Sequence, residues 1–269
     1  MAELYGSEAF SPAQIAQKVE DIGVAKARLP LLQTVLLGVL AGAFIGLGSL
    51  FFTLVASDAA LSFAVQRVLG GLVFCLGLLL VVVAGAELFT GNNLLAMAWA
   101  ARRITTAELL RNWAIVCAAN FAGAAGLALL VWLSGHPSMN GGAVAQAALR
   151  IAAAKVALPA SEAFFRGVLC NVLVCMAVWM ALAGRSVADK AVAIAFPITA
   201  FVAAGFEHSI ANMYFLPLAM LLQTAGGPVG WAELARNLGP VIAGNLVGGS
   251  VLVALVYWVI YLRPARRDG

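Results

Sequence analysis

The sequence predicts an all-α membrane protein whose six transmembrane helices form two inverted three-helix repeats, with helices 2 and 5 broken. Apolar residues make up 63% of the 269 residues and charged residues only 10%, and the mean hydropathy is +0.99. A soluble domain of this size could not cover its surface with so little charge. Two polar motifs that interrupt apolar sequence in corresponding places of the two halves predict the breaks.

Six apolar runs approach or exceed the roughly 20 residues that a helix needs to cross a bilayer. They cover residues 31–55, 68–86, 113–133, 163–183, 191–205 and 238–262. Shorter apolar pieces, 94–101 and 214–222, follow the second and fifth runs, which indicates that these two helices stop and resume. The runs leave room for one compact transmembrane domain at 29–263, between an N-terminal segment at 1–28 and a tail at 264–269.

The N-terminal segment is too polar for a secretory signal. Residues 11–14, Ser-Pro-Ala-Gln, are typical of a capping box with proline at the first helical position. Ile15, Val19 and Ile22 follow at helical spacing. We therefore expect a short amphipathic helix that lies at the membrane surface.

The distribution of basic residues predicts the orientation of the chain. A net charge of +4 could suggest a nucleic-acid partner, but its placement argues against one. If the first helix starts in the cytoplasm, 11 of the 16 basic residues share that side, and the positive-inside rule puts both termini there. These residues are Lys18, Lys26, Arg28, Arg102, Arg103, Arg111, Arg185, Lys190, Arg263, Arg266 and Arg267.

The two polar motifs have the form Glu-x-x-x-x-Asn, at residues 87–92 and 207–212. Further short matches in the same order, Gly38 with Gly167 and Asn120 with Asn245, support a duplication. Three spans in each half would make the halves inverted relative to each other. Because backbone groups freed inside hydrocarbon need partners, we expect Thr90, Gly91, Asn92, Ser209 and Asn212 to hydrogen-bond the loose ends of the breaks.

The ionisable groups at the breaks can act in more than one way. Each resuming half-helix directs the positive end of its dipole toward the bilayer midplane, which attracts anions. Glu87 and Glu207 are expected to anchor the broken segments rather than to serve as ligands. His208 occupies a break and could exchange protons near neutrality, since imidazole has a pKa of about 6.5. Lys155 either extends to water or attracts anions to a pore mouth.

Other polar and apolar residues near the breaks are less specific. Asn171 and Asn245 either pack against other helices or face a pore. Phe74, Leu78, Phe89 and Phe201 are near the breaks, but such residues in membrane helices usually face lipid or the core. The cysteines lack zinc-ligand or redox spacing, so neither a metal nor a cofactor is expected. An intramembrane enzyme built on Glu87, Glu207 and His208 is a lower-ranked alternative, because the metal-ligand spacings of helices are missing.

Residues 86–93, Ala-Glu-Leu-Phe-Thr-Gly-Asn-Asn, and 205–213, Gly-Phe-Glu-His-Ser-Ile-Ala-Asn-Met, resemble the two signatures of the formate/nitrite transporter family. The stretch 184–217 particularly resembles its formate channels, and the resemblance covers roughly residues 10–262. It implies a homopentamer in the bacterial inner membrane, with an aquaporin-like protomer that carries its own pore. It also implies passage of small monovalent anions of weak acids: formate first, nitrite or hydrosulfide as alternatives.

The resemblance also implies roles for individual residues. His208 would be the central pore histidine, Thr90 its hydrogen-bonding partner, and Lys155 the residue that draws anions into the outer vestibule. Asn171 and Asn245 match pore-lining asparagines. The apolar constrictions would comprise Phe74, Leu78 and Phe201 on the outer side, and Leu88, Phe89 and Val174 on the inner side.

A mechanism follows from the energetic cost of burying charge. An isolated carboxylate in a dry constriction is far less favourable than its neutral acid. We therefore expect His208 to supply a proton inside the pore. The competing mechanism is anion conductance in which His208 only donates a hydrogen bond.

Overall fold

The computed structural model describes residues 9–224 and 226–263, and every regular element in these residues is helical. The predicted tail at 264–269 lies outside them. Six helical segments are long and apolar enough to cross a membrane, which confirms the predicted fold class. They are α2 (Leu31–Ala56), α3 (Phe63–Leu80) with the π-helix η2 (Val81–Gly85), α5 (Thr106–Leu133), α7 (Ala160–Ala183), α8 (Val187–Ala204), and α10 (Trp231–Leu246), which continues through the π-helix η6 (Val247–Leu255) into α11 (Val256–Tyr261).

Five of the six spans begin earlier than their apolar runs, and in three of them polar side chains cap the first helical turn. A capping box joins Thr105 to Glu108 at the start of α5, and another joins Ser186 to Asp189 at the start of α8. In α10, Glu233 accepts a hydrogen bond from the Gly230 N–H. Hydropathy detects the part of a helix suited to hydrocarbon, whereas the helix itself extends to its cap.

Both predicted breaks are present. The π-helix η2 ends at Gly85, whose φ is +87°, and α8 is followed by Gly205, whose φ is +76°. The chain resumes as the 3₁₀-helix η3 (Gly91–Leu95) with α4 (Ala96–Ala100) in the first half, and as α9 (Ser209–Leu222) in the second. The helices therefore resume earlier than residues 94 and 214, because the motif residues themselves form the first turns.

The two halves share a pattern of close helix packing. α2 packs against α5, and α7 packs against α10 and η6. A Cβ atom on Gly123 of α5 would overlap the backbone carbonyl of Val39 in α2, and one on Gly248 of η6 would overlap that of Val168 in α7. Glycine is required at both positions because the backbones are in direct contact.

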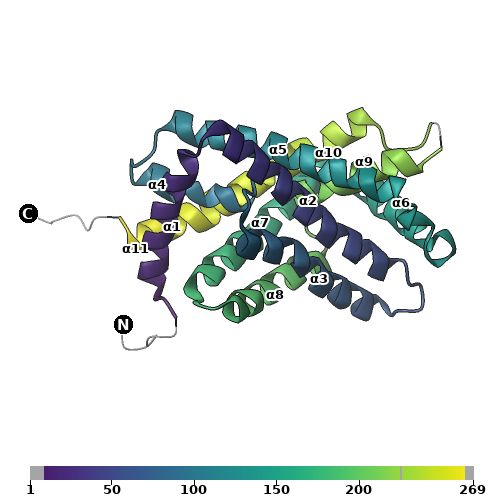
Figure 1. Ribbon diagram of the computed structural model, residues 1–269, viewed down its shortest axis with the longest axis horizontal. Coiled ribbons are helices and arrows are strands. Elements are labelled where there is room, and N and C mark those ends of the chain that lie inside the picture. Colours follow the sequence, from purple (N-terminus) through teal and green to yellow (C-terminus); the bar gives the residue numbers. More distant parts are fainter. Residues whose placement is uncertain (1–8, 225, 264–269) are drawn as a thin grey trace, which may run out of the picture.

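One further helix precedes each half. α1 (Pro12–Ala27) leads through Pro30 into α2, and α6 (Ala143–Val156) leads through Pro159 into α7. α1 begins with the expected capping box, from Ser11 to Gln14. Figure 1 shows α1 and α6 at opposite ends of the molecule. The repeat unit thus contains a short surface helix in addition to three spans. The short 3₁₀-helices η4 (His136–Ser138) and η5 (Asn140–Gly142) connect α5 to α6.

Candidate functional site

A closed ring of polar side chains surrounds the second break. Glu207 accepts from the Lys155 Nζ at 2.9 Å through Oε1, and from the Asn212 Nδ2 at 2.6 Å through Oε2. Asn212 also donates to the Asn237 Oδ1 at 2.8 Å, and Asn237 Nδ2 donates to the Lys155 carbonyl at 2.9 Å. We call these four residues the Lys155 ring. It ties α6, the break, α9 and α10 together, and it neutralises a glutamate that is only 4% exposed.

The first break carries an equivalent set, the Lys26 ring, formed by Lys26, Glu87, Asn92 and Asn112. Glu87 accepts from the Lys26 Nζ at 2.8 Å and from the Asn92 Nδ2 at 2.7 Å. Asn92 donates to the Asn112 Oδ1 at 3.0 Å, and Asn112 donates to the Lys26 carbonyl at 3.2 Å. The surface helix α1 is thereby bonded to the first break as α6 is to the second.

Three ring members were not among the predicted site residues: Lys26, Asn112 and Asn237. The signal for them was an offset shared with a pair already recognised: Asn112 and Asn237 are separated by the same 125 positions as Asn120 and Asn245. Lys26 and Lys155 are separated by the same 129 positions as the glycine pair Gly38 and Gly167. A lysine on a surface helix is normally interpreted as exposed to solvent, and only the equivalent lysine in the other repeat indicates a structural role.

The backbone of the first break is held by one buried amide, that of Asn120 in α5. Its Nδ2 donates to the carbonyls of Gly38 at 2.7 Å and Glu87 at 2.9 Å, and its Oδ1 accepts from the Phe89 N–H at 2.9 Å. These bonds satisfy groups that the interrupted helix leaves free, which is obligatory at membrane depth.

Asn245 in α10 does the same for the second break. Its Nδ2 donates to the carbonyls of Gly167 at 2.9 Å and Glu207 at 3.0 Å, and its Oδ1 accepts from the Ser209 N–H at 3.0 Å. The Ser209 hydroxyl itself is buried and has no hydrogen-bond partner among the described residues. The backbone groups freed at this break are therefore satisfied from a neighbouring helix and not by the Ser209 hydroxyl, whereas Asn212 joins the two sides of the break through the Glu207 side chain.

His208 is 2% exposed and sits between the two halves. Its Nε2 lies 3.1 Å from the Thr90 Oγ1 of the first break, and its Nδ1 accepts from the Ala211 N–H at 3.2 Å. Because a backbone N–H can only donate, Nδ1 of the neutral ring carries no proton and Nε2 carries it. Neutral His208 therefore donates to Thr90, and the ring is fixed in one tautomer by the first turn of α9.

Asn171 joins the halves at the same depth. Its Nδ2 lies 2.7 Å from the Asn93 Oδ1 and the Asn245 carbonyl, and 3.2 Å from the Thr90 carbonyl. Asn171 and Asn245 are fully buried, and neither lines one of the two cavities described below. Their bonds hold the helix backbones at the crossing of the two breaks.

Two cavities lie on either side of this crossing. The Lys155 cavity has a volume of about 450 Å³ and reaches Phe74, Phe201 and His208. The Lys26 cavity has a volume of about 480 Å³ and reaches Leu78, Leu88 and Gly91. Their linings on α3 are four residues apart, which corresponds to about 6 Å along a helix.

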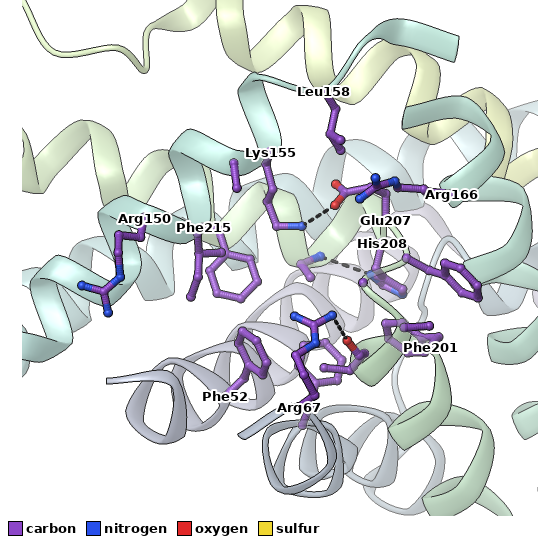
Figure 2. A pocket seen from close by; sticks show the side chains of 18 of the residues that line it. Phe52, Arg67, Arg150, Lys155, Leu158, Arg166, Phe201, Glu207, His208 and Phe215 are labelled. Carbon is purple, nitrogen blue, oxygen red and sulfur yellow. Dashed lines mark hydrogen bonds and ion pairs between the residues drawn. The ribbon is translucent and has the colours of Figure 1, made fainter. Parts of the chain in front are cut away.

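Aromatic rings close the inner end of the Lys155 cavity. The rings of Phe74 and Phe201 pack edge to face at 5.6 Å between centroids, and Phe201 stacks on His208 at 5.8 Å. Figure 2 shows Phe201 and His208 side by side below the Lys155–Glu207 ion pair. A small ion in this cavity would meet the imidazole immediately beside an apolar barrier.

The residues predicted to form constrictions are distributed differently from the expected grouping. Phe74 and Phe201 line the Lys155 cavity together, but Leu78 lines the Lys26 cavity with Leu88. Phe89 and Val174 are buried in the main hydrophobic core and line neither cavity. Within the described residues, no three histidine, cysteine, aspartate or glutamate side chains are grouped so that they could hold a metal ion.

Comparison with known proteins agrees with this architecture. The model of the formate/nitrite transporter family matches residues 13–259. The chain is 40% identical over 269 residues to the formate channel FocA of Escherichia coli, with 94% of each chain covered. It is 38% identical to a probable formate transporter of Methanothermobacter thermautotrophicus, covering 96% of this chain and 99% of that one.

Two solved structures share the fold. An FNT family ion channel superposes with a TM-score of 0.85 at 30% identity, covering 92% of this chain and 98% of that one. A pentameric formate channel with formate bound superposes with a TM-score of 0.78 at 34% identity, covering 87% and 98%. Family match, relatives and fold agree, and this multi-pass membrane protein belongs to the formate/nitrite transporter family.

Proposed function

We propose that the protein is a channel for small monovalent anions of weak acids, with formate as the first candidate and nitrite or hydrosulfide as alternatives. The observation that carries this proposal is the position of His208, which lines a cavity, adjoins the Phe74–Phe201 barrier and bonds to Thr90 across the two breaks. The relatives that are named as formate channels support the choice of substrate.

We further propose a homopentamer in the bacterial inner membrane, with both termini in the cytoplasm. Support comes from the distribution of basic residues and from the pentameric formate channel that shares the fold. In this orientation the Lys26 cavity opens toward the cytoplasm and the Lys155 cavity toward the periplasm.

Passage is proposed to be coupled to a proton through His208. The desolvation cost of a carboxylate greatly exceeds that of its neutral acid. An imidazolium at His208 would transfer its Nε2 proton to a formate oxygen, and the resulting formic acid would cross the apolar barrier. Formation of that imidazolium requires Nδ1 to release the Ala211 N–H, which the neutral ring accepts at 3.2 Å. Proton uptake would therefore be linked to a small movement of the first turn of α9.

The competing mechanism is conductance of the anion past a neutral His208 that only donates a hydrogen bond. The same Nδ1 contact favours this alternative, because Nδ1 can accept the Ala211 N–H only while the ring is neutral. The Lys155 ring and the Lys26 ring are proposed to hold the broken segments and to present an ammonium group at each mouth.

The function is tested by parallel flux measurements with purified protein in proteoliposomes. Inward gradients of formate, nitrite and hydrosulfide are compared at matched concentrations, with protein-free vesicles as the blank. We expect formate to pass well above the blank and His208→Phe to abolish its passage. Absence of flux for all three anions would refute the proposal, and a strong preference for nitrite or hydrosulfide would reassign the substrate within the family.

A further inference from the structure

The charges around the two cavities are not equivalent. Four basic residues line the Lys155 cavity. Two of them are neutralised: Lys155 by Glu207 at 2.9 Å, and Arg166 by Glu162 at 3.0 Å. The other two, Arg67 and Arg150, form no salt bridge with any carboxylate of the described residues.

The Lys26 cavity contrasts with this arrangement. Its only charged lining residues within the described parts of the chain are Lys26 and Glu87, and they form an ion pair at 2.8 Å. The formal charge of this lining is therefore zero. Of the Lys155 and Lys26 cavities, only the Lys155 cavity therefore carries basic residues without a carboxylate partner.

Arg67 is held rigidly at that mouth. It projects from α3, and its Nε and Nη2 donate to the carbonyls of Ala203 and Val202, each at 2.8 Å. These carbonyls belong to the last turn of α8. Gly205 follows in the left-handed region, and a Cβ atom there would lie 2.9 Å from the Arg67 Nη2. The Arg67 Nη1 donates to no described residue, so part of the guanidinium is available to a ligand.

The orientation of the side chain directs this charge inward. Figure 2 shows Arg67 and Lys155 entering the cavity from opposite sides, with Phe201 and His208 at its inner end. Arg67 also covers carbonyls at the C-terminal end of α8, which is the negative end of the helix dipole and would otherwise repel an anion.

We propose that Arg67, assisted further out by Arg150, attracts and positions the anion at this mouth before it reaches Lys155. The inference rests on the proposed function. Lys155 and Glu207 together form a dipole, whose field falls off faster with distance than that of a net charge. The long-range attraction must then come from the cations without a carboxylate partner. A cleft with low-dielectric walls focuses such a field and raises the entry rate of an oppositely charged solute.

A kinetic signature distinguishes this role from a structural one. At low substrate concentration a passive pore has the same permeability in both directions, so in this regime a charge at one mouth changes influx and efflux by the same factor. The half-saturating concentration, in contrast, falls only for the face that carries the charge. The attraction also weakens with salt, because the Debye length shortens from about 30 Å at 0.01 M to about 8 Å at 0.15 M.

The test measures formate permeability in proteoliposomes at these two ionic strengths, set with a salt of a large impermeant anion. Arg67→Gln removes the charge, Arg67→Lys keeps it without the two-pronged contact to α8, and Arg150→Gln removes the outer charge. Arg236→Gln is the matched control, because Arg236 is exposed, pairs with Glu233 at 3.7 Å and does not line the cavity.

We expect Arg67→Gln to lower permeability about threefold to tenfold at low ionic strength and to approach the wild type at high ionic strength. Arg67→Lys should restore most of the loss, Arg150→Gln should show a smaller loss, and Arg236→Gln none. A salt dependence of Arg67→Gln equal to that of the wild type would overturn the proposal, as would an Arg67→Lys protein as impaired as Arg67→Gln. If Arg67→Gln does not assemble, equal salt dependence of Arg150→Gln and Arg236→Gln would overturn it. Wild-type protein that passes none of the three anions would refute the proposed function instead.

Discussion

Replacement of Asn245 by alanine removes the α10 side chain that bonds the backbone of the second break and the backbone of α7. Three hydrogen bonds are lost, to the carbonyls of Gly167 and Glu207 and from the Ser209 N–H. Side-chain hydrogen bonds inside membrane proteins average about 0.6 kcal/mol each, which gives about 2 kcal/mol for the three. Backbone groups left unsatisfied in the fully buried site raise the loss toward about 4 kcal/mol.

The assay is unfolding of the purified protein by denaturant in mild detergent, followed by loss of helical circular dichroism. Asn120→Ala removes the equivalent three bonds in the first half, so its loss should agree with that of Asn245→Ala within about 1 kcal/mol. Gln17→Ala on the exposed face of α1 is the control and should change the free energy of unfolding by less than about 0.5 kcal/mol. If Asn245→Ala lowers the free energy of unfolding by less than about 0.5 kcal/mol, the role assigned to the Asn245 amide is refuted.

Gly123→Ala should destabilise the protein by about 1–3 kcal/mol, because the new methyl group meets the backbone of α2. Gly126 faces open space in the same helix, so Gly126→Ala should be neutral or stabilising. Equal effects of the two substitutions on thermal unfolding would contradict this packing. Glu207→Gln should destabilise the protein by about 3–5 kcal/mol, since it leaves the buried Lys155 ammonium without its carboxylate partner. The double variant Glu207→Gln with Lys155→Met, which also removes the ammonium charge, should recover part of the loss in the same assay. Hydrogen bonding to Arg103 lowers the pKa of Asp21 below its ordinary value of 3.8. Because the pKa of Asp21 is lower in the folded protein, the contact with Arg103 stabilises the fold above pH 3.8 and is lost only as the pH falls through the folded pKa. Hydrogen exchange of α1 should therefore not change between about pH 5 and pH 8, whereas Asp21→Asn should increase it. A transition in hydrogen exchange with a midpoint near pH 6 that Asp21→Asn abolishes would contradict this assignment.

The spans, both breaks and the position of His208 within the second break could be predicted from the sequence, because each depends on local composition. A stretch of apolar residues must be hidden from water whatever its neighbours are, and a glutamate within such a stretch must have a partner. The identity of that partner is not local. Lys26 lies 61 positions before Glu87, and Asn112 lies 20 positions after Asn92.

The apolar barrier could not be assigned from sequence for a different reason. Phe74 and Leu78 are one turn apart on α3, yet they line different cavities. An apolar side chain is equally compatible with lipid, core or pore, so only the rotation of each helix decides which of these it faces. The π-helix η6 likewise has no counterpart in α5, and we find no residue pattern that predicts it.

The pH dependence of formate uptake by His208 variants tests whether this imidazole carries the proton. His208→Asn retains a hydrogen-bond donor but cannot carry the proton, His208→Phe retains neither, and His136→Asn changes the other histidine, which lies outside both cavities. If His208 carries the proton, uptake by wild type and His136→Asn rises as external pH falls, His208→Asn loses this dependence, and His208→Phe is inactive. Unchanged pH-dependent uptake by His208→Asn would contradict the claim that this imidazole carries the proton.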